Sequence, residues 1–134
     1  MSLDGTVGIV LVSHSAALAE GAAELATQVS GGTVAVVPAG GTDGGGLGTS
    51  SAKVERALRL ADSGAGVVIL PDLGSAVLTV RALLGEPGDL PGPVELADAP
   101  FVEGAVAATV AAAGGGDIKA VLAAAQEARH AGKL

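Results

Sequence analysis

Short apolar runs alternate along this 134-residue chain with longer segments in which apolar residues recur every three or four positions. The runs are Val7–Val12, Thr33–Val37, Gly66–Leu70 and a weaker Val94–Ala97. In the first three, nearly every position is apolar and many are β-branched, a pattern typical of strands that are covered on both faces. The runs therefore predict four strands.

The segments between the runs have the apolar spacing of amphipathic helices. The residues that carry this spacing are Leu18, Ala22, Leu25 and Val29 in the first segment, Val54, Ala57, Leu58 and Ala61 in the second, and Ala76, Val77, Val80, Leu83 and Leu84 in the third. Two further helices are predicted over Val102–Ala113 and Ile118–His130, the second of them behind Asp117 as its N-cap.

Alternating strands and helices indicate an α/β fold. We predict an open, doubly wound sheet of four parallel strands in the order 2-1-3-4, with right-handed crossovers and helices on both faces. Alanine-rich helix faces would let the helices lie close to the sheet. Pro38–Gly41 would end the second strand, and Gly85–Pro93 would form a stiff turn before the fourth. Because no repeat and no shift in composition divides the chain, residues 1–134 are expected to form a single domain.

The composition excludes several classes of function. Seven basic residues against fourteen acidic ones give a net charge of −7, and Phe is the one aromatic residue in the chain, so nucleic-acid binding is not expected. Without cysteine there is no disulfide framework and no thiolate zinc site. The chain has no apolar run of the roughly 18–20 residues that span a bilayer and no basic signal region at its start. We therefore expect an acidic, cytoplasmic domain without membrane insertion.

Candidate chemistry gathers in the loops after the first three strands, since ligands of such sheets bind at the carboxyl ends of the strands. His14 follows the first strand and precedes a helix, whose positive N-terminus disfavours imidazolium and attracts anions. A neutral imidazole at that point would be a nucleophile that can accept a phosphoryl group. The alternative is a turn histidine that caps the helix or bonds to a nearby carbonyl.

Asp72 ends the third strand, which would neighbour the first, so its carboxylate could reach His14. An aspartate that accepts the Nδ1–H would fix the tautomer of the imidazole and leave Nε2 free. The competing interpretation is a helix N-cap, because Asp72 and Ser75 both precede a helix.

The glycine-rich segment Gly40–Ser50 lacks the lysine of a Walker loop and does not contain the glycine spacing of a dinucleotide fingerprint. It is interpreted as a flap whose amides and hydroxyls cover a small anion, or else as a flexible loop that ends in a Thr49 cap. A serine hydrolase is disfavoured because the G-x-S-x-G elbow is missing. Asp43, Asp72 and one histidine do not make a dedicated metal site, so no metal and no cofactor are expected.

Four short motifs, in this order and at this spacing, resemble a known family. They are G-I-V-L-V-S-H-S at Gly8–Ser15, G-G-T-D…G-T-S at 40–50, P-D-L-G-S-A at Pro71–Ala76 and A-P-F-V-E-G-A at Ala99–Ala105. From about Gly8 to the final helix, the sequence resembles the enzyme IIA domain of the phosphotransfer subunit of bacterial phosphoenolpyruvate-dependent dihydroxyacetone kinase, a relative of mannose-type enzyme IIA.

The resemblance implies a phosphohistidine relay. His14 would be phosphorylated at Nε2 by the histidine phosphocarrier protein, and would pass the phosphate to ADP bound in the nucleotide-binding subunit of the kinase. Asp72 would support the histidine. The resemblance also implies a homodimer, and the residues expected to bind the phosphate are Ser15, Gly41, Thr42, Thr49 and Ser75.

Two alternatives stay open at the level of the sequence. One is a mannose-type enzyme IIA that feeds a sugar transporter, and the other is a non-catalytic regulatory or anion-binding module. Mannose-type relatives append a swapped antiparallel strand, whereas this chain ends in a predicted helix, so a dimer with swapped strands is not expected. Some family members continue into a fused carrier domain. Because nothing follows Leu134 in this sequence, the donor is expected to be a separate chain, unless the sequence is a piece of a longer one.

Overall fold

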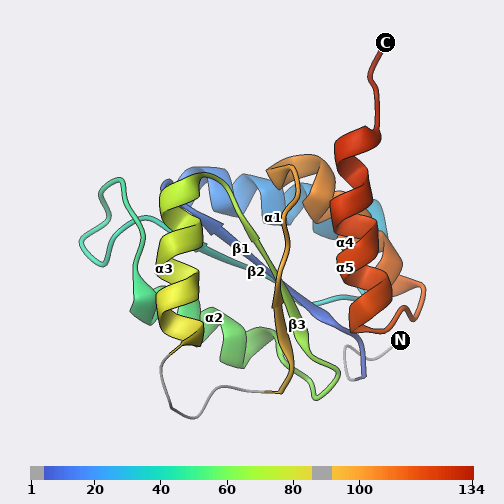
Figure 1. Cartoon of the computed structure of the whole chain (residues 1–134), viewed down its shortest axis with the longest axis horizontal. Coiled ribbons are helices and arrows are strands. Elements are labelled where there is room, and N and C mark those ends of the chain that lie inside the picture. The colour runs from blue at the N-terminus through green and yellow to red at the C-terminus, as the bar shows by residue number, and fades with distance from the viewer. Residues whose placement is uncertain (1–4, 86–91) are drawn as a thin grey trace.

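The computed structural model describes residues 5–85 and 92–134 of the chain (Figure 1). Four parallel strands form one sheet in the order β2-β1-β3-β4, which confirms the predicted fold class. The strands are β1 (Gly8–Ser13), β2 (Val36–Gly40), β3 (Val67–Pro71) and β4 (Val94–Leu96). β1 therefore lies between β2 and β3, the arrangement that brings the first three predicted loops to one edge of the sheet.

Within the described residues, five helices cover the sheet. They are α1 (Ala16–Ser30), α2 (Ser51–Ala61), α3 (Gly74–Leu84), α4 (Phe101–Ala113) and α5 (Ile118–Glu127), followed by the short 3₁₀ helix η1 (Ala128–His130). Helices α1, α4 and α5 pack on one face of the sheet, and α2 and α3 pack on the other (Figure 1). Across the described part of the chain, none of the helices has both the length and the apolar character needed to cross a membrane.

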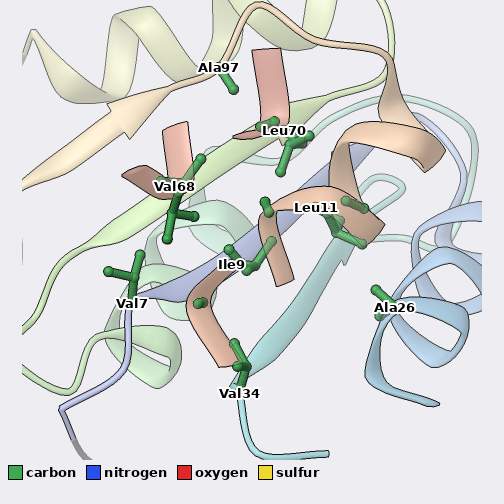
Figure 2. Close-up of a cluster of buried hydrophobic side chains, with 14 of the residues drawn as sticks. Val7, Ile9, Leu11, Ala26, Val34, Val68, Leu70 and Ala97 are labelled. Carbon is green, nitrogen blue, oxygen red and sulfur yellow. The ribbon is translucent and has the colours of Figure 1, made fainter. Parts of the chain in front are cut away.

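The core consists of two layers separated by the sheet, because successive strand residues point to opposite faces. Ile9 and Leu11 of β1 join the layer beneath α1, α4 and α5, where Figure 2 shows them beside Val68 and Leu70 of β3. Val10 and Val12 point into the other layer, toward α2 and α3. β1 is buried along its whole length, as its unbroken apolar run predicts.

Helix α1 contains the four residues on which its prediction rests, but its buried face differs from the predicted apolar stripe. Its buried residues are Ala19, Ala22, Ala23 and Ala26. Leu18, Leu25 and Val29 are exposed. Small side chains let the helix axis lie close to the sheet, as the alanine content predicts, and that short distance leaves no room for leucine side chains beneath the helix.

The second strand lies three residues later than its predicted position, at Val36–Gly40 instead of Thr33–Val37. The strand ends at Gly40, inside the segment Pro38–Gly41 that was predicted to end it, but Pro38 and Ala39 belong to the strand. β2 pairs with β1 alone and so lies at the edge of the sheet, where a proline without an N–H can be accommodated. The other strands lie within about one residue of their predicted ranges. Most of the predicted turn Gly85–Pro93 falls in residues 86–91, outside the described part of the chain.

Gly40 allows the start of α1 to approach the end of β2. A Cβ atom at this position would lie 2.5 Å from the backbone oxygen of Ser15 and 2.8 Å from the Cα of Ala16. Both neighbours are backbone atoms, which cannot move aside without displacing the first turn of α1. The absence of a side chain at Gly40 therefore helps to set the position of the segment that carries His14.

We predict that Gly40→Ala lowers the free energy of unfolding by about 1–3 kcal/mol, the usual cost of overpacking. Urea unfolding followed by circular dichroism measures the change. Gly44→Ala is the matched control, because a Cβ atom at Gly44 meets nothing within 4 Å. Equal stability of the two variants would contradict the close-approach argument.

Candidate active site

The candidate site lies where the connections from two neighbouring strands leave toward opposite faces of the sheet. α1 follows β1 onto one face, and α3 follows β3 onto the other. In doubly wound sheets this switch point opens a crevice at the carboxyl ends of the strands. His14 is the first residue after β1, and Asp72 is the first residue after β3.

The side chains of His14 and Asp72 contact each other directly. Nδ1 of His14 lies 2.9 Å from Oδ1 of Asp72, and the backbone N–H of His14 donates to Oδ2 at 3.0 Å. The Asp72 side chain is 8% exposed and that of His14 is 24% exposed. The carboxylate is therefore sheltered, whereas part of the imidazole faces solvent.

Two further groups donate to the Asp72 carboxylate, the hydroxyl of Ser13 at 2.9 Å and the backbone N–H of Leu73 at 2.7 Å. Burial by itself raises the pKa of Asp72, but the hydrogen bonds from His14, Ser13 and Leu73 outweigh this effect and hold the pKa below its ordinary value of 3.8. Asp72 is consequently a carboxylate at neutral pH.

The ionised carboxylate determines the tautomer of His14. A carboxylate can only accept hydrogen bonds, so Nδ1 of His14 carries the proton when the ring is neutral. Nε2 then presents its lone pair and lies in hydrogen-bond contact with Oγ of Ser75, whose hydroxyl is the donor. The outward nitrogen of the imidazole is thus the nucleophilic one.

The imidazole lies against the N-terminus of α3. Its place in the sequence predicts instead that it lies at the N-terminus of α1, the helix that directly follows His14. Ser15 already caps α1, because its side chain accepts the N–H of Leu18 at 3.2 Å. The N-cap of α3 is Leu73, which supplies no side-chain hydrogen bond. The first turn of α3 therefore offers backbone N–H groups beside Nε2 that no side-chain cap occupies.

The glycine-rich loop is attached to the histidine segment at both of its ends. The N–H of Gly41 donates to the backbone oxygen of Ser13 at 3.1 Å, and that of Gly48 donates to the backbone oxygen of His14 at 2.9 Å. Between these points, Oγ1 of Thr42 accepts the N–H of Gly46 at 3.0 Å and closes a turn. The loop thus lies beside the site, and the side chain of Thr42 forms its hydrogen bond within the loop.

One interpretation of the loop expected Thr49 to cap α2, and this is wrong. The cap is Ser50, whose side chain accepts the N–H of Lys53 at 3.2 Å. Thr49 instead shares a 2.7 Å hydrogen bond with Thr79 of α3, which joins the loop to that helix. Of the five residues expected to bind phosphate, Ser75 contacts the imidazole. Ser15 follows His14 in the chain, and Gly41, Thr42 and Thr49 belong to the loop that is attached to the His14 segment. The role of all five in binding phosphate stays a prediction.

Ser13 is the site residue that sequence reasoning left without a role. It is fully buried and contacts Asp72 directly. A polar residue at the end of an otherwise apolar, buried strand, immediately before the histidine, is the signal that could have identified it.

In residues 5–85 and 92–134 no three side chains of His, Cys, Asp or Glu gather in a way that could hold a metal ion. His130 lies apart from the site, exposed in η1.

We predict that Asp72 contributes stability that is lost in acid. Because its pKa is lower in the folded state, this contribution is complete above the ordinary carboxyl pKa of 3.8 and disappears as the pH falls through the folded-state value. The stability difference between the wild type and Asp72→Asn should therefore stay constant at higher pH and narrow as the pH falls below about 4. Urea unfolding at a series of pH values measures the difference, and one that stays constant over the whole series would contradict the assignment.

Comparison with known proteins gives relatives along most of the chain. One relative is a DhaM from Providencia stuartii, the phosphoryl donor subunit of a PEP-dependent dihydroxyacetone kinase. It is 38% identical over an alignment 130 residues long that covers 93% of this chain and 27% of the relative. DhaM of Escherichia coli is 38% identical over 120 residues, 87% of this chain and 25% of that protein. The chain thus spans about a quarter of the length of these relatives.

A shorter relative matches over most of its own length. DhaM of PEP-dependent dihydroxyacetone kinase 2 from Listeria innocua is 35% identical over 105 residues, 78% of this chain and 84% of the relative. Among solved structures, the crystal structure of a protein of unknown function, EF1359, superimposes with a TM-score of 0.80 at 36% identity and covers 96% of this chain and 97% of that one.

The model of the EIIA-man family, described as the PTS system fructose IIA component, matches residues 8–122. These residues include β1 and the histidine that follows it, the glycine-rich loop, β3 and the aspartate that follows it, and the first half of α5. The chain therefore belongs to the EIIA-man family, as an enzyme IIA domain of the kind found in DhaM.

Proposed function

We propose that this chain is a phosphohistidine relay of a bacterial phosphotransferase system. His14 accepts a phosphoryl group from the histidine phosphocarrier protein and passes it to ADP in the nucleotide-binding subunit of dihydroxyacetone kinase. One observation carries the proposal: the carboxylate of Asp72 engages Nδ1 of His14 at 2.9 Å and leaves Nε2 as a partly exposed nucleophile.

In the accepting step, the lone pair of Nε2 attacks the phosphorus of the donor phosphohistidine. The new Nε2–P bond forms as the donor's N–P bond breaks, and that electron pair returns to the donor imidazole. Nδ1 keeps its proton, so positive charge develops on the ring of His14. The adjacent Asp72 carboxylate stabilises this charge, the same contribution that an aspartate makes beside the histidine of a hydrolase triad.

In the donating step, a terminal phosphate oxygen of ADP attacks the phosphorus and ATP forms. The Nε2–P bond breaks, its electron pair returns to Nε2, and the ring of His14 becomes neutral again with its proton still on Nδ1. Asp72 therefore holds the same tautomer before and after each turnover, and the relay needs no cofactor and no metal of its own.

The first turn of α3 provides an environment for the phosphoryl group. A group on Nε2 would displace the hydroxyl of Ser75 from its present contact and lie beside the N–H groups of Gly74 and Ser75. A helix N-terminus attracts anions through these N–H groups and through its positive end. The proposed phosphate site also includes Ser15, Gly41, Thr42 and Thr49. The amide of Gly41 now donates to Ser13, and the hydroxyl of Thr49 bonds to Thr79, so both would have to exchange these partners for the phosphate.

The names of the relatives favour the kinase as acceptor, since each is described as the phosphoryl donor subunit of a dihydroxyacetone kinase. A mannose-type enzyme IIA would instead pass its phosphate to a sugar transporter. Mixing the phosphorylated chain with ADP and the nucleotide-binding subunit distinguishes the two acceptors. A relay of the kinase loses its phosphate in this mixture, whereas an enzyme IIA of a sugar transporter keeps it. The proposal includes a cytoplasmic location and a homodimer.

We predict that the wild-type chain gains the mass of one phosphate when it is incubated with phosphoenolpyruvate, enzyme I and the phosphocarrier protein. The phosphate should be labile in acid and stable in base, as expected for phosphohistidine. His14→Ala should take up none, and His130→Ala should match the wild type, because His130 lies in the exposed η1. Intact mass spectrometry measures the uptake. Acid-labile phosphate on His14→Ala would disprove the assignment, and no uptake by the wild type would favour an anion-binding module.

We predict that Asp72→Asn folds but accepts phosphate about 10²–10⁴-fold more slowly, because the carboxylate that fixes the tautomer of His14 and stabilises its positive charge is lost. An amide can present its NH₂ group to Nδ1, which favours the tautomer with the proton on Nε2. Quench-flow measurement of phosphate uptake gives the rate, and circular dichroism checks the fold. A rate equal to that of the wild type would reduce Asp72 to a structural residue at the start of α3.

A further inference from the structure

Ser13 is a buried polar side chain directly behind the reacting pair. It ends β1 with no exposed surface, and its neighbour Val12 is equally buried. A buried hydroxyl costs free energy unless both its proton and its lone pairs find partners. Ser13 has both partners, because its Oγ donates to Oδ2 of Asp72 at 2.9 Å and accepts the N–H of Ser15 at 3.0 Å.

The direction of these hydrogen bonds is fixed by their partners. The backbone N–H of Ser15 can only donate, and the Asp72 carboxylate can only accept, so the single proton of the Ser13 hydroxyl must point at Asp72. Ser15 is also the N-cap of α1. The hydroxyl of Ser13 therefore links the first turn of α1 to a carboxylate at the end of β3.

The Asp72 carboxylate has a separate pair of donors at each oxygen. Oδ2 accepts the Ser13 hydroxyl and the backbone N–H of His14. Oδ1 accepts Nδ1–H of His14 and the N–H of Leu73. With all four donors present, rotation of the carboxylate about its terminal bond would break hydrogen bonds at both oxygens. Without Ser13, one donor remains at Oδ2, and the carboxylate can rotate away from Nδ1 at a lower cost.

We infer that Ser13 is a positioning residue for the relay, which holds the Asp72 carboxylate in the orientation that keeps the proton of His14 on Nδ1. This inference rests on the proposed phosphotransfer at His14. Ser13 does not touch the phosphoryl group, because its hydroxyl lies behind Asp72 and is fully buried. Its effect reaches Nε2 through the carboxylate and the ring.

Ser13→Ala tests the inference, since it removes the hydroxyl and little volume. We expect phosphate uptake by His14 to slow about 10–100-fold, the range found when a hydrogen-bond partner that orients a metal-bound histidine is removed. Ser13→Thr keeps a hydroxyl and should recover most of the rate. The matched control is Thr109→Val, which removes the hydroxyl of a fully buried residue that bonds to Ala105 within α4. It should lose stability and keep the wild-type rate.

A second readout is independent of turnover. In the unphosphorylated wild type, ¹⁵N NMR of the His14 ring at a pH where it is neutral should show the proton on Nδ1. In Ser13→Ala the two nitrogen shifts should move toward each other, because both tautomers become populated. The pKa of Asp72 should rise toward its ordinary value, since one of the hydrogen bonds that lower it is gone.

The inference is overturned if Ser13→Ala keeps both the wild-type rate and the wild-type ring shifts. It is equally overturned if Thr109→Val slows uptake as much, because the effect would then follow stability. If the wild type accepts no phosphate, the proposed relay fails, and the ring shifts of the unphosphorylated chain still decide whether Ser13 orients Asp72. If Ser13→Ala does not fold, the ring shifts of Ser13→Thr decide. Shifts equal to those of the wild type support the inference, and shifts averaged between the two tautomers contradict it.

Discussion

The contact between the Asp72 carboxylate and the imidazole of His14 is the interaction on which the account of this domain depends. It joins the ends of β1 and β3, two neighbouring strands whose connecting helices lie on opposite faces of the sheet. Four hydrogen bonds converge on the carboxylate, from the side chain and backbone of His14, from Ser13 and from Leu73. They keep it ionised, and the ionised carboxylate in turn makes Nε2 the nucleophilic nitrogen.

Close packing of small residues makes this geometry possible. Gly40 lets the first turn of α1 lie against the end of β2, and Gly8 lets β1 pass beneath α2, where a Cβ atom would meet the backbone oxygen of Ala61 at 2.1 Å. The buried face of α1 consists of alanines. Short distances between helices and sheet leave little freedom for the strand ends, so the core restrains the backbone of His14 and Asp72. The glycine-rich loop adds a hydrogen bond from Gly48 to the backbone oxygen of His14.

Periodicity and residue type predicted the central part of the fold and the contact between His14 and Asp72. The unbroken apolar runs of β1 and β3 identified two strands buried on both faces, and those strands carry His14 and Asp72. The edge strand was misplaced, because an edge tolerates Pro38 inside a strand and the sequence does not reveal which strand lies at the edge. The sequence also did not reveal which side of α1 is exposed. Its leucines have the spacing of buried residues but face solvent, whereas its alanines face the sheet.

The parts of the site that could not be predicted depend on tertiary contacts between distant residues. Ser13 and Asp72 are 59 positions apart, and Thr49 reaches Thr79 across 30 positions. The helix that serves the imidazole is α3 instead of α1, because Ser15 caps its own helix and the ring reaches across to Ser75. Spacing along a chain gives the type of each element, whereas these contacts require knowledge of which loops meet.

The most direct measurement of the central claim is the identity of the nitrogen that carries the phosphate. The chain is labelled with ¹⁵N in its histidine rings, phosphorylated enzymatically and examined by ¹⁵N and ³¹P NMR. The Asp72 contact at Nδ1 predicts that the ³¹P coupling appears at Nε2 of His14, with the proton on Nδ1. A phosphate on Nδ1 would require Asp72 to release the ring before the reaction, and that result would contradict the account.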